Sequence, residues 1–475
     1  PYLNIGSEDF QTNSGKGSEY TSNSVFGRVI YSYADRYLFQ ANIRHDGSSR
    51  FAKGYRWGTF PSFSAGWVMS EEKFMKSLNW DWLSFLKLRG SWGILGNERI
   101  GDDYFPYIAL MSFGNSLFYM ADGSVVSDKT ARPAILAVED ITWETTTSTD
   151  FGLDANFFNN RLQFHFDYYW KQTKDMLLKI EIPYFMGYNN PNTNAGKMST
   201  HGYDIELAWN DRIGDLQYGV NVNFSDFLSK IDYMNDGEQI SNGKIKRAGV
   251  LFNEYYGYVC DGIYQTQEEV NNSARTSTTV TVGDLKYRDI SGPDGVPDGI
   301  ISPEYDRVPL GNSLPRFQYG GTFNASYKGI DFSIAFQGIG KQNSYLSTAM
   351  VQPLRDNYGS VPSIIEGKYW SPFNTAEENL SARYPRLSNV SKSNNYATSN
   401  FWMFNGSYFR LKNLTLGYTL PETWTQKAGI DRVRFYISGS DLFCLSNFPD
   451  GWDPEMGASS YPITTSLVMG LQVNF

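Results

Sequence analysis

The sequence has little of what would build a disulfide scaffold or a helical membrane protein. Only two cysteines, Cys260 and Cys444, occur in 475 residues. They could pair in an oxidising compartment or stand as two unrelated thiols. No run approaches the roughly 18 consecutive apolar residues of a membrane-spanning helix. The N-terminus shows no charged segment followed by an apolar one, as a secretory signal would. We therefore expect either a mature protein or part of a longer one.

Positive charge is also scarce. The chain has 41 Lys and Arg against 50 Asp and Glu, which gives a formal net charge of -9. A partner rich in phosphates is disfavoured by that balance, so we expect no nucleic-acid partner. The sequence also has no Ser nucleophile elbow and no paired catalytic motif. We therefore do not expect an enzyme. Of the functions considered for this chain, hydrolysis by an outer-membrane protein is the least favoured.

Aromatic residues are abundant. They make up 16% of the chain, with 33 Tyr and 32 Phe, while the mean hydropathy is -0.42. A polar average is compatible with a membrane β-barrel, because lipid-facing and lumen-facing residues alternate along each strand and dilute the apolar half. Aromatic girdles at the two membrane interfaces would account for the Tyr and Phe content.

The last residues of the chain alternate strictly. The apolar positions are Leu467, Met469, Leu471, Val473 and Phe475, and the residues between them form the second set. A period of two predicts a strand with different surroundings on its two sides. Because the apolar set continues to a terminal aromatic residue, we expect the closing strand of an outer-membrane barrel, with Phe475 as its assembly signal.

The same alternation recurs along the chain and predicts an all-β, transmembrane antiparallel barrel of about thirteen strands here. The second face of these strands reads as mostly small and neutral-polar, as expected for a wet lumen. The phase changes within 407–418, which predicts a β-bulge there. The expected strands are 25–33, 37–45, 57–68, 86–95, 146–157, 162–171, 199–209, 216–226, 316–327, 330–339, 407–418, 432–442 and 464–475.

The connections alternate in length, as in outer-membrane barrels with short periplasmic turns and long outer loops. Short turns are expected at 34–36, 158–160, 210–215 and 328–329, and intermediate ones at 69–85 and 419–431. Long loops are expected near 96–145, 172–198, 227–315, 340–406 and 443–463. When the strands are counted back from the last one, this alternation of short and long connections places the C-terminus in the periplasm and the long loops outside the cell.

The number of strands has a further consequence. An odd count is unusual for bacterial single-chain barrels, and the first strand would run in the wrong direction to begin one. We therefore expect 25–475 to be the C-terminal portion of a larger barrel, one of about 22 strands with a plug in its lumen. Residues 1–24 would be part of an outer loop or a disordered lead-in, and no plug-like domain is recognised in this sequence.

Several segments together resemble one family. They are YADRYL at 33–38, RHDGSSRF at 44–51, WGTFPSFSAGW at 57–67, LKLRGSWG at 86–93 followed by GN at 96–97, YGYVCDGIY at 256–264, GDLKYRD at 283–289, YKGIDF at 327–332 and YFRLKNLTLGY at 408–418. Each is weak alone, but their order and spacing are specific. The chain from about residue 25 onward is similar to the SusC/RagA TonB-dependent outer-membrane transporters of the Bacteroidetes.

The resemblance implies a 22-stranded barrel with an N-terminal plug, and import of oligosaccharides or peptides through TonB. It also implies a SusD-like lipoprotein as a lid over the outer mouth. The thirteen strands would be the last of the barrel, so the plug, the TonB-contacting segment and the earlier strands are not in this sequence. An alternative is a SusC-like barrel that serves as a structural subunit of a larger outer-membrane complex.

Aromatic residues in the long loops are candidates for substrate or partner contact, because rings anchor interfaces and binding sites. The residues are Tyr119, Trp370, Phe373, Trp402 and Phe404. For each one, packing within its loop or a place in a girdle is the alternative. The loops are large enough to dock a partner, and we expect the lipoprotein lid and a homodimer contact there before substrate.

An acidic stretch at 289–306 could bind calcium. Asp289, Asp294, Asp298 and Asp306 offer carboxylate oxygens, and glycines allow tight turns. The spacing does not fit an EF-hand, because Val296 and Tyr305 occupy positions that need ligands. The alternative is a turn-rich outer loop in which Asp and Gly serve backbone geometry.

Overall fold

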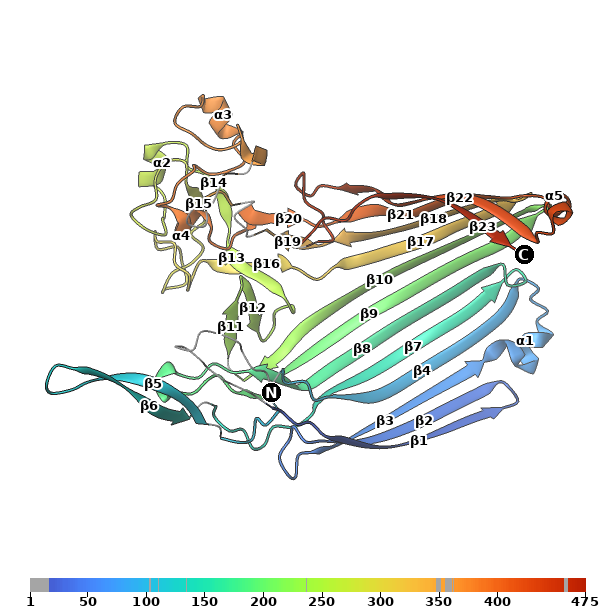
Figure 1. Cartoon of the computed structure of the whole chain (residues 1–475), viewed down its shortest axis with the longest axis horizontal. Helices are drawn as coiled ribbons and strands as arrows, with labels where there is room; N and C mark the ends of the chain where they lie inside the picture. Colours follow the sequence, from blue (N-terminus) through green and yellow to red (C-terminus); the bar gives the residue numbers. More distant parts are fainter. Residues whose placement is uncertain are drawn as a thin grey trace.

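Thirteen antiparallel strands form one curved wall, which dominates the computed structural model (Figure 1). The structure describes residues 17–475 except 102–103, 110, 134, 236, 347–351, 355–360, 362 and 457–459. The strands, each paired with the next, are β1 (Ser22–Tyr33), β2 (Tyr37–Ser48), β3 (Trp57–Val68), β4 (Leu83–Asn97), β7 (Glu144–Phe157), β8 (Leu162–Lys179), β9 (Asn192–Ile213), β10 (Leu216–Met234), β17 (Arg316–Tyr327), β18 (Ile330–Lys341), β21 (Tyr408–Thr419), β22 (Arg432–Ser446) and β23 (Ser466–Asn474).

The thirteen predicted strands are thereby confirmed, and so is the predicted bulge. In β21, Leu411 pairs with Phe336 and Asn413 with Ala335, so Lys412 is the extra residue. The strands β8, β9 and β10 run further than the alternation indicated. The turn expected at 210–215 is shorter, because β9 continues to Ile213 and pairs directly with Leu216.

Tight turns close the hairpins at one end of the wall. Lys328 and Gly329, which join β17 to β18, have φ of 46° and 87°. Positive φ at both positions is the geometry of a two-residue turn whose twist matches the strands it joins. Ala34 and Asp35 have similar φ values, 52° and 53°. The short turns predicted at 34–36 and 328–329 therefore form as expected.

Connection length alternates with the two ends of the wall, as predicted (Figure 1). The short turns lie at one end, together with the helices α1 (Lys73–Ser77) and α5 (Glu422–Thr425) of the intermediate connections. The long loops gather at the opposite end. We call these the turn end and the loop end.

The long loops carry secondary structure of their own, which the alternation did not predict. They contain β5 (Met111–Tyr119), β6 (Val125–Pro133), β11 (Glu238–Ser241), β12 (Lys244–Arg247), β13 (Glu254–Tyr258), β14 (Cys260–Ile263), β15 (Leu285–Tyr287), β16 (Arg307–Asn312), β19 (Asn343–Tyr345), β20 (Met403–Asn405), α2 (Gln267–Asn271), α3 (Ala376–Leu380) and α4 (Lys392–Asn395). Among the described residues, none of the helices is long and apolar enough to cross a membrane.

The two faces of the wall differ as the alternation predicts. On β23, the side chains of Leu467, Met469 and Leu471 are 73%, 81% and 58% exposed. Each pairs across β22 with a residue on the same face, and Leu471 lies opposite Phe435. We call this the apolar face and the opposite one the polar face.

A charge placed on the apolar face tests this assignment. We expect Leu471→Asp to reduce the yield of assembled barrel several-fold, because a carboxylate there would have to enter hydrocarbon. The neighbouring substitution Gln472→Asp places the same charge on the polar face and should assemble nearly normally. Heat-modifiable migration of the protein in outer-membrane fractions measures assembly. Equal losses for the two variants would contradict the assignment of the faces.

Candidate functional site: the polar face and the loop assembly

The polar face carries a charge network on three adjacent strands. The guanidinium of Arg89, on β4, binds both carboxylate oxygens of Asp167 on β8 at 2.5 and 2.6 Å. It also contacts Asp154 on β7 at 3.1 Å. His165 Nδ1 lies 3.0 Å from Asp154 Oδ1. Sequence reasoning expected a mostly neutral face, and that expectation is wrong for this part of the wall.

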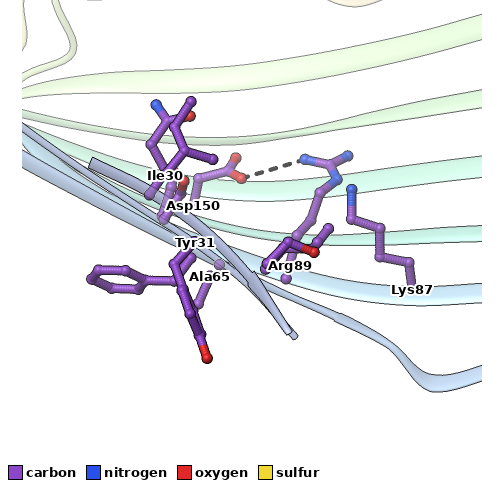
Figure 2. Close-up of a pocket in the computed structure, with 14 residues that line it drawn as sticks. Ile30, Tyr31, Ala65, Lys87, Arg89 and Asp150 are labelled. Carbon is purple, nitrogen blue, oxygen red and sulfur yellow. Dashed lines mark ion pairs between the residues drawn. The ribbon is translucent and has the colours of Figure 1, made fainter. Parts of the chain in front are cut away.

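A groove lies beside this network, where β1 to β4 meet β7 (Figure 2). Its volume is about 420 Å³. Lys87, Arg89 and Asp150 contribute charge, and Arg89 Nη1 lies 3.7 Å from Asp150 Oδ1. Ile30 adds apolar surface, whereas Tyr31 points away from the charged side chains (Figure 2). The polar face can therefore offer hydrogen bonds, fixed charge and apolar contact to a molecule within the barrel.

A second network joins the last long loop to the polar face near the loop end. Arg410 of β21 is 3% exposed. Its Nη2 contacts both carboxylate oxygens of Asp453 at 2.6 and 2.7 Å, and its Nε pairs with Glu455. The bulged Lys412 reaches Asp441 with Nζ at 2.7 Å from Oδ1. The segment that carries Asp453 and Glu455 is thus held against the wall.

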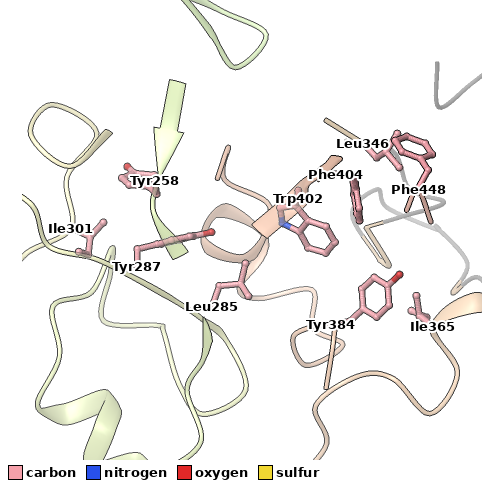
Figure 3. Packing of buried hydrophobic residues seen from close by; sticks show 10 residues of the cluster. All are labelled: Tyr258, Leu285, Tyr287, Ile301, Leu346, Ile365, Tyr384, Trp402, Phe404 and Phe448. Atoms are coloured by element: carbon pink, nitrogen blue, oxygen red, sulfur yellow. The ribbon is translucent and has the colours of Figure 1, made fainter. Parts of the chain in front are cut away.

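The largest of four apolar clusters among the described residues lies at the loop end (Figure 3). Residues from three long loops pack in it, so we call these loops together the loop assembly. The core residues are Tyr258, Leu285, Tyr287, Ile301, Leu346, Ile365, Tyr384, Trp402, Phe404 and Phe448. These segments are far apart in the sequence, and their packing joins the three loops into one folded unit.

A buried carboxylate fixes two of these loops to each other. Asp284 is fully buried. Arg386 donates to its two oxygens, with Nε at 2.7 Å and Nη2 at 3.2 Å. Ser391 Oγ and Asn395 Nδ2 donate to it at 2.8 and 3.0 Å. Both oxygens of the buried carboxylate therefore have donors and its charge is paired, as a buried ion pair requires.

The predicted aromatic residues divide into two groups. Trp402 is fully buried, and Phe404 and Trp370 are 7% and 9% exposed. Trp402 Nε1 donates to the backbone oxygen of Asn395 at 2.7 Å, and these three side chains pack within the loop assembly. Phe373 and Tyr119, at 95% and 84% exposed, stand free in different loops. Contact of any of the five with substrate or partner stays a prediction.

Three of the four aspartates of the acidic stretch serve as backbone acceptors. Asp306 accepts hydrogen bonds from the backbone N–H groups of Ile290, Ser291 and Ser302 at 2.7 to 3.2 Å. Asp289 and Asp298 each accept one backbone N–H, and Asp294 is exposed. Within the described residues, no group of three or more His, Cys, Asp or Glu could hold a metal ion. Calcium binding here stays a prediction.

The two cysteines and the terminal Phe475 are the other residues that the sequence singled out. Cys260 and Cys444 are both free thiols, and burial in the loop assembly raises the pKa of the Cys260 thiol to about 11. Phe475 follows the last residue of β23 and is 87% exposed. Its proposed role in assembly stays a prediction.

Sequence reasoning missed the residues that organise this site. The ion pairs of Arg89, Arg410 and Asp284 depend on strand register or loop packing across dozens of residues. One signal was available: lone Asp and Arg residues, such as Arg89 and Asp167, stand among neutral side chains at polar-face positions of the alternation. Opposite charges on one face of adjacent strands attract each other.

An antiparallel wall with an exposed apolar face, an ion-paired polar face and all long loops at one end defines a transmembrane β-barrel of the outer-membrane class. The chain belongs to the TonB dependent receptor-like β-barrel family, whose model matches residues 1–438. Its place is therefore the outer membrane.

Individual proteins of known sequence or structure show which members of this family the chain is similar to. The TonB-dependent receptor SusC of Bacteroides thetaiotaomicron is 31% identical over 470 residues, which cover 95% of this chain and 43% of that protein. The TonB-dependent receptor P3 of Formosa agariphila is 30% identical over 488 residues, covering 95% and 45%. The solved RagAB peptide transporter has the same fold, with a TM-score of 0.78 at 24% identity over 96% of this chain and 48% of that one.

These matches confirm the similarity to the SusC/RagA transporters. The chain spans about half the length of the curated relatives it matches.

Proposed function

We propose that this chain forms part of an importer for oligosaccharides or peptides, driven through TonB. Membership of the TonB-dependent receptor family and the similarity to SusC and to the RagAB peptide transporter support this function. In this arrangement the turn end faces the periplasm, the loop end faces the outside, and lipid covers the apolar face.

The observation that carries the proposal is the polar face of the wall, with the loop assembly standing at one end of it (Figure 1). Charges such as Arg89 and Asp167 are held by one another, so this part of the polar face presents a hydrated surface whose charges are largely ion-paired. A polar solute could pass such a wall, whereas an apolar lining would suit a lipid-soluble ligand.

Three partners belong to the proposal. A SusD-like lipoprotein would cover the loop end, TonB would act through a plug of the kind the resemblance implies, and a second copy would form a homodimer. The hairpin of β5 and β6 supports a docking role, because Phe113 and Tyr119 on its apolar side are 81% and 84% exposed. A two-stranded hairpin is marginal in water unless it packs against something.

Uptake by cells of the native host tests the function. Deletion of the gene should abolish accumulation of labelled oligosaccharides or peptides from a mixed pool, and collapse of the proton-motive force should do the same. The native receptor should also bring down a SusD-like lipoprotein during purification. If uptake of every labelled pool survives deletion while a membrane complex falls apart, the chain is a structural subunit, the alternative reading.

A further inference from the structure

Three lysines form a compact group on the apolar face. Lys174, on β8, lies at a register shift opposite Lys197 of β9, because Thr173 pairs with Met198 and Met176 with Gly196. Lys230, on β10, pairs with Ser199, two residues from Lys197 on the same strand. Lateral and diagonal neighbours on one face of a sheet lie about 5 to 8 Å apart. The three ammonium groups can therefore act on one small ligand.

Their face follows from the strand register. Trp170 is exposed on the apolar face of β8, and Lys174 lies an even number of residues beyond it. On β9, Lys197 shares the face of His201, which pairs with Trp170. Lys174 and Lys230 are exposed, and Lys197 is half-buried. All three therefore stand on the side that the proposed function assigns to lipid.

Their charges are not neutralised by the protein. In the described parts of the chain, the lysines with carboxylate partners are elsewhere: Lys76, Lys87, Lys286, Lys328 and Lys412. Two aspartates are near the group. Asp232 accepts a hydrogen bond from Ser199 Oγ at 2.9 Å, and Asp175 is an exposed residue of the register shift in β8. Neither forms an ion pair with the group, so the three lysines outnumber the carboxylates near them and the group keeps a net positive charge.

The height of the group along the wall fits a headgroup layer. The apolar face of β8 runs from Leu162 to Trp170, and a rise of about 3.3 Å per residue with a tilt near 40° gives it a height of about 20 Å. At its upper limit an aromatic cluster marks the interface: Phe151 and Trp170 are 57% and 46% exposed, and Tyr168 lies 4.4 Å from Trp170 between ring centroids. Lys174 follows about 10 Å higher by the same geometry.

We propose that Lys174, Lys197 and Lys230 bind the phosphate groups of phosphorylated glycolipids in the outer leaflet. Lysine ammonium groups suit phosphate as compact point charges. The group continues the lipid-facing aromatic cluster, so the apolar part of the same molecule has a surface beneath its headgroup. This inference rests on the membrane orientation in the proposed function, and it adds a lipid partner that transport itself does not require.

Lipid retention by the native receptor tests the proposal. The receptor, purified from outer membranes and delipidated, is returned to vesicles of zwitterionic phospholipid with a bisphosphorylated or a dephosphorylated glycolipid added, and mass spectrometry measures the glycolipid retained. A Lys174→Gln, Lys197→Gln, Lys230→Gln triple variant should retain on the order of 10- to 100-fold less of the phosphorylated form, since each lysine near an anionic surface contributes to attraction. The matched control substitutes exposed lysines outside the group: Lys53→Gln, Lys73→Gln, Lys427→Gln.

Each result decides the question. Wild type and control should prefer the phosphorylated glycolipid, and the triple variant should lose that preference while its heat-modifiable migration stays normal. Equal retention by triple variant and control would overturn the proposal, as would competition at low concentration by inorganic phosphate alone. Loss of a co-purifying protein with lipid retention unchanged would instead assign the lysines to a protein contact. Uptake that survives deletion of the gene, with lipid binding by the receptor intact, would count against the importer, not against this site.

Discussion

Substitution of Asp284 by alanine should open the loop assembly while the wall stays folded. The carboxylate is fully buried and receives Arg386, Ser391 and Asn395. Removal of one member of a buried ion pair leaves the other charge without compensation, which typically costs about 3–5 kcal/mol. We expect amide hydrogen exchange to rise strongly over 281–287 and 383–397, because this contact lies at the centre of the hydrogen bonds that join the two segments, such as Leu285 N–H to Asn395 Oδ1 at 2.9 Å.

The control lies in the same loop. Asp294 is exposed, so Asp294→Ala removes the same charge without opening a buried site. It should leave exchange in both segments unchanged. Asp284→Asn keeps the shape of the side chain but not its charge and should give an intermediate increase. If Asp284→Ala protects 383–397 as well as wild type does, the ion pair does not hold the two loops together.

The strands could be predicted because alternation is a local property. Each strand of the wall has one face toward an apolar environment, so its pattern appears within about ten residues of sequence. Even the bulge at Lys412 was visible, because Phe409 and Leu411 fall out of phase with Leu414 and Leu416. The extensions of β8 to β10 were missed because strand residues beyond the membrane are not obliged to alternate apolar and polar side chains.

The site was harder to predict than the fold for a physical reason. Trp402 and Phe404 were singled out as candidates for substrate or partner contact, but their burial depends on which distant segments pack on them, and Trp402 packs against Tyr384 of another part of the loop. The partners of Arg89 lie 65 and 78 residues away, on strands whose register decides which carboxylates face it. No local pattern encodes such pairs.

Arg410, on strand β21 of the wall, holds the last long loop against the polar face. Substitution by methionine keeps most of the side-chain volume but removes the charge that pairs with Asp453 and Glu455. Because Arg410 is 3% exposed, the two carboxylates would be left close together in a site with little water, at a cost of about 3–5 kcal/mol. The segment that carries them should leave the polar face, and its amide exchange should rise by at least tenfold.

A compensating variant separates charge from packing in that result. Arg410→Met combined with Asp453→Asn and Glu455→Gln removes the stranded charges, so it should recover much of the protection that the single variant loses, since a buried pair replaced as a unit costs far less than one broken partner. Arg432→Met, at an exposed position of the adjacent strand β22, is the matched control and should change nothing in the loop. If the triple variant exchanges as fast as Arg410→Met alone, the arginine holds the loop by its shape and hydrophobic stem, and the ion pairs are incidental to it.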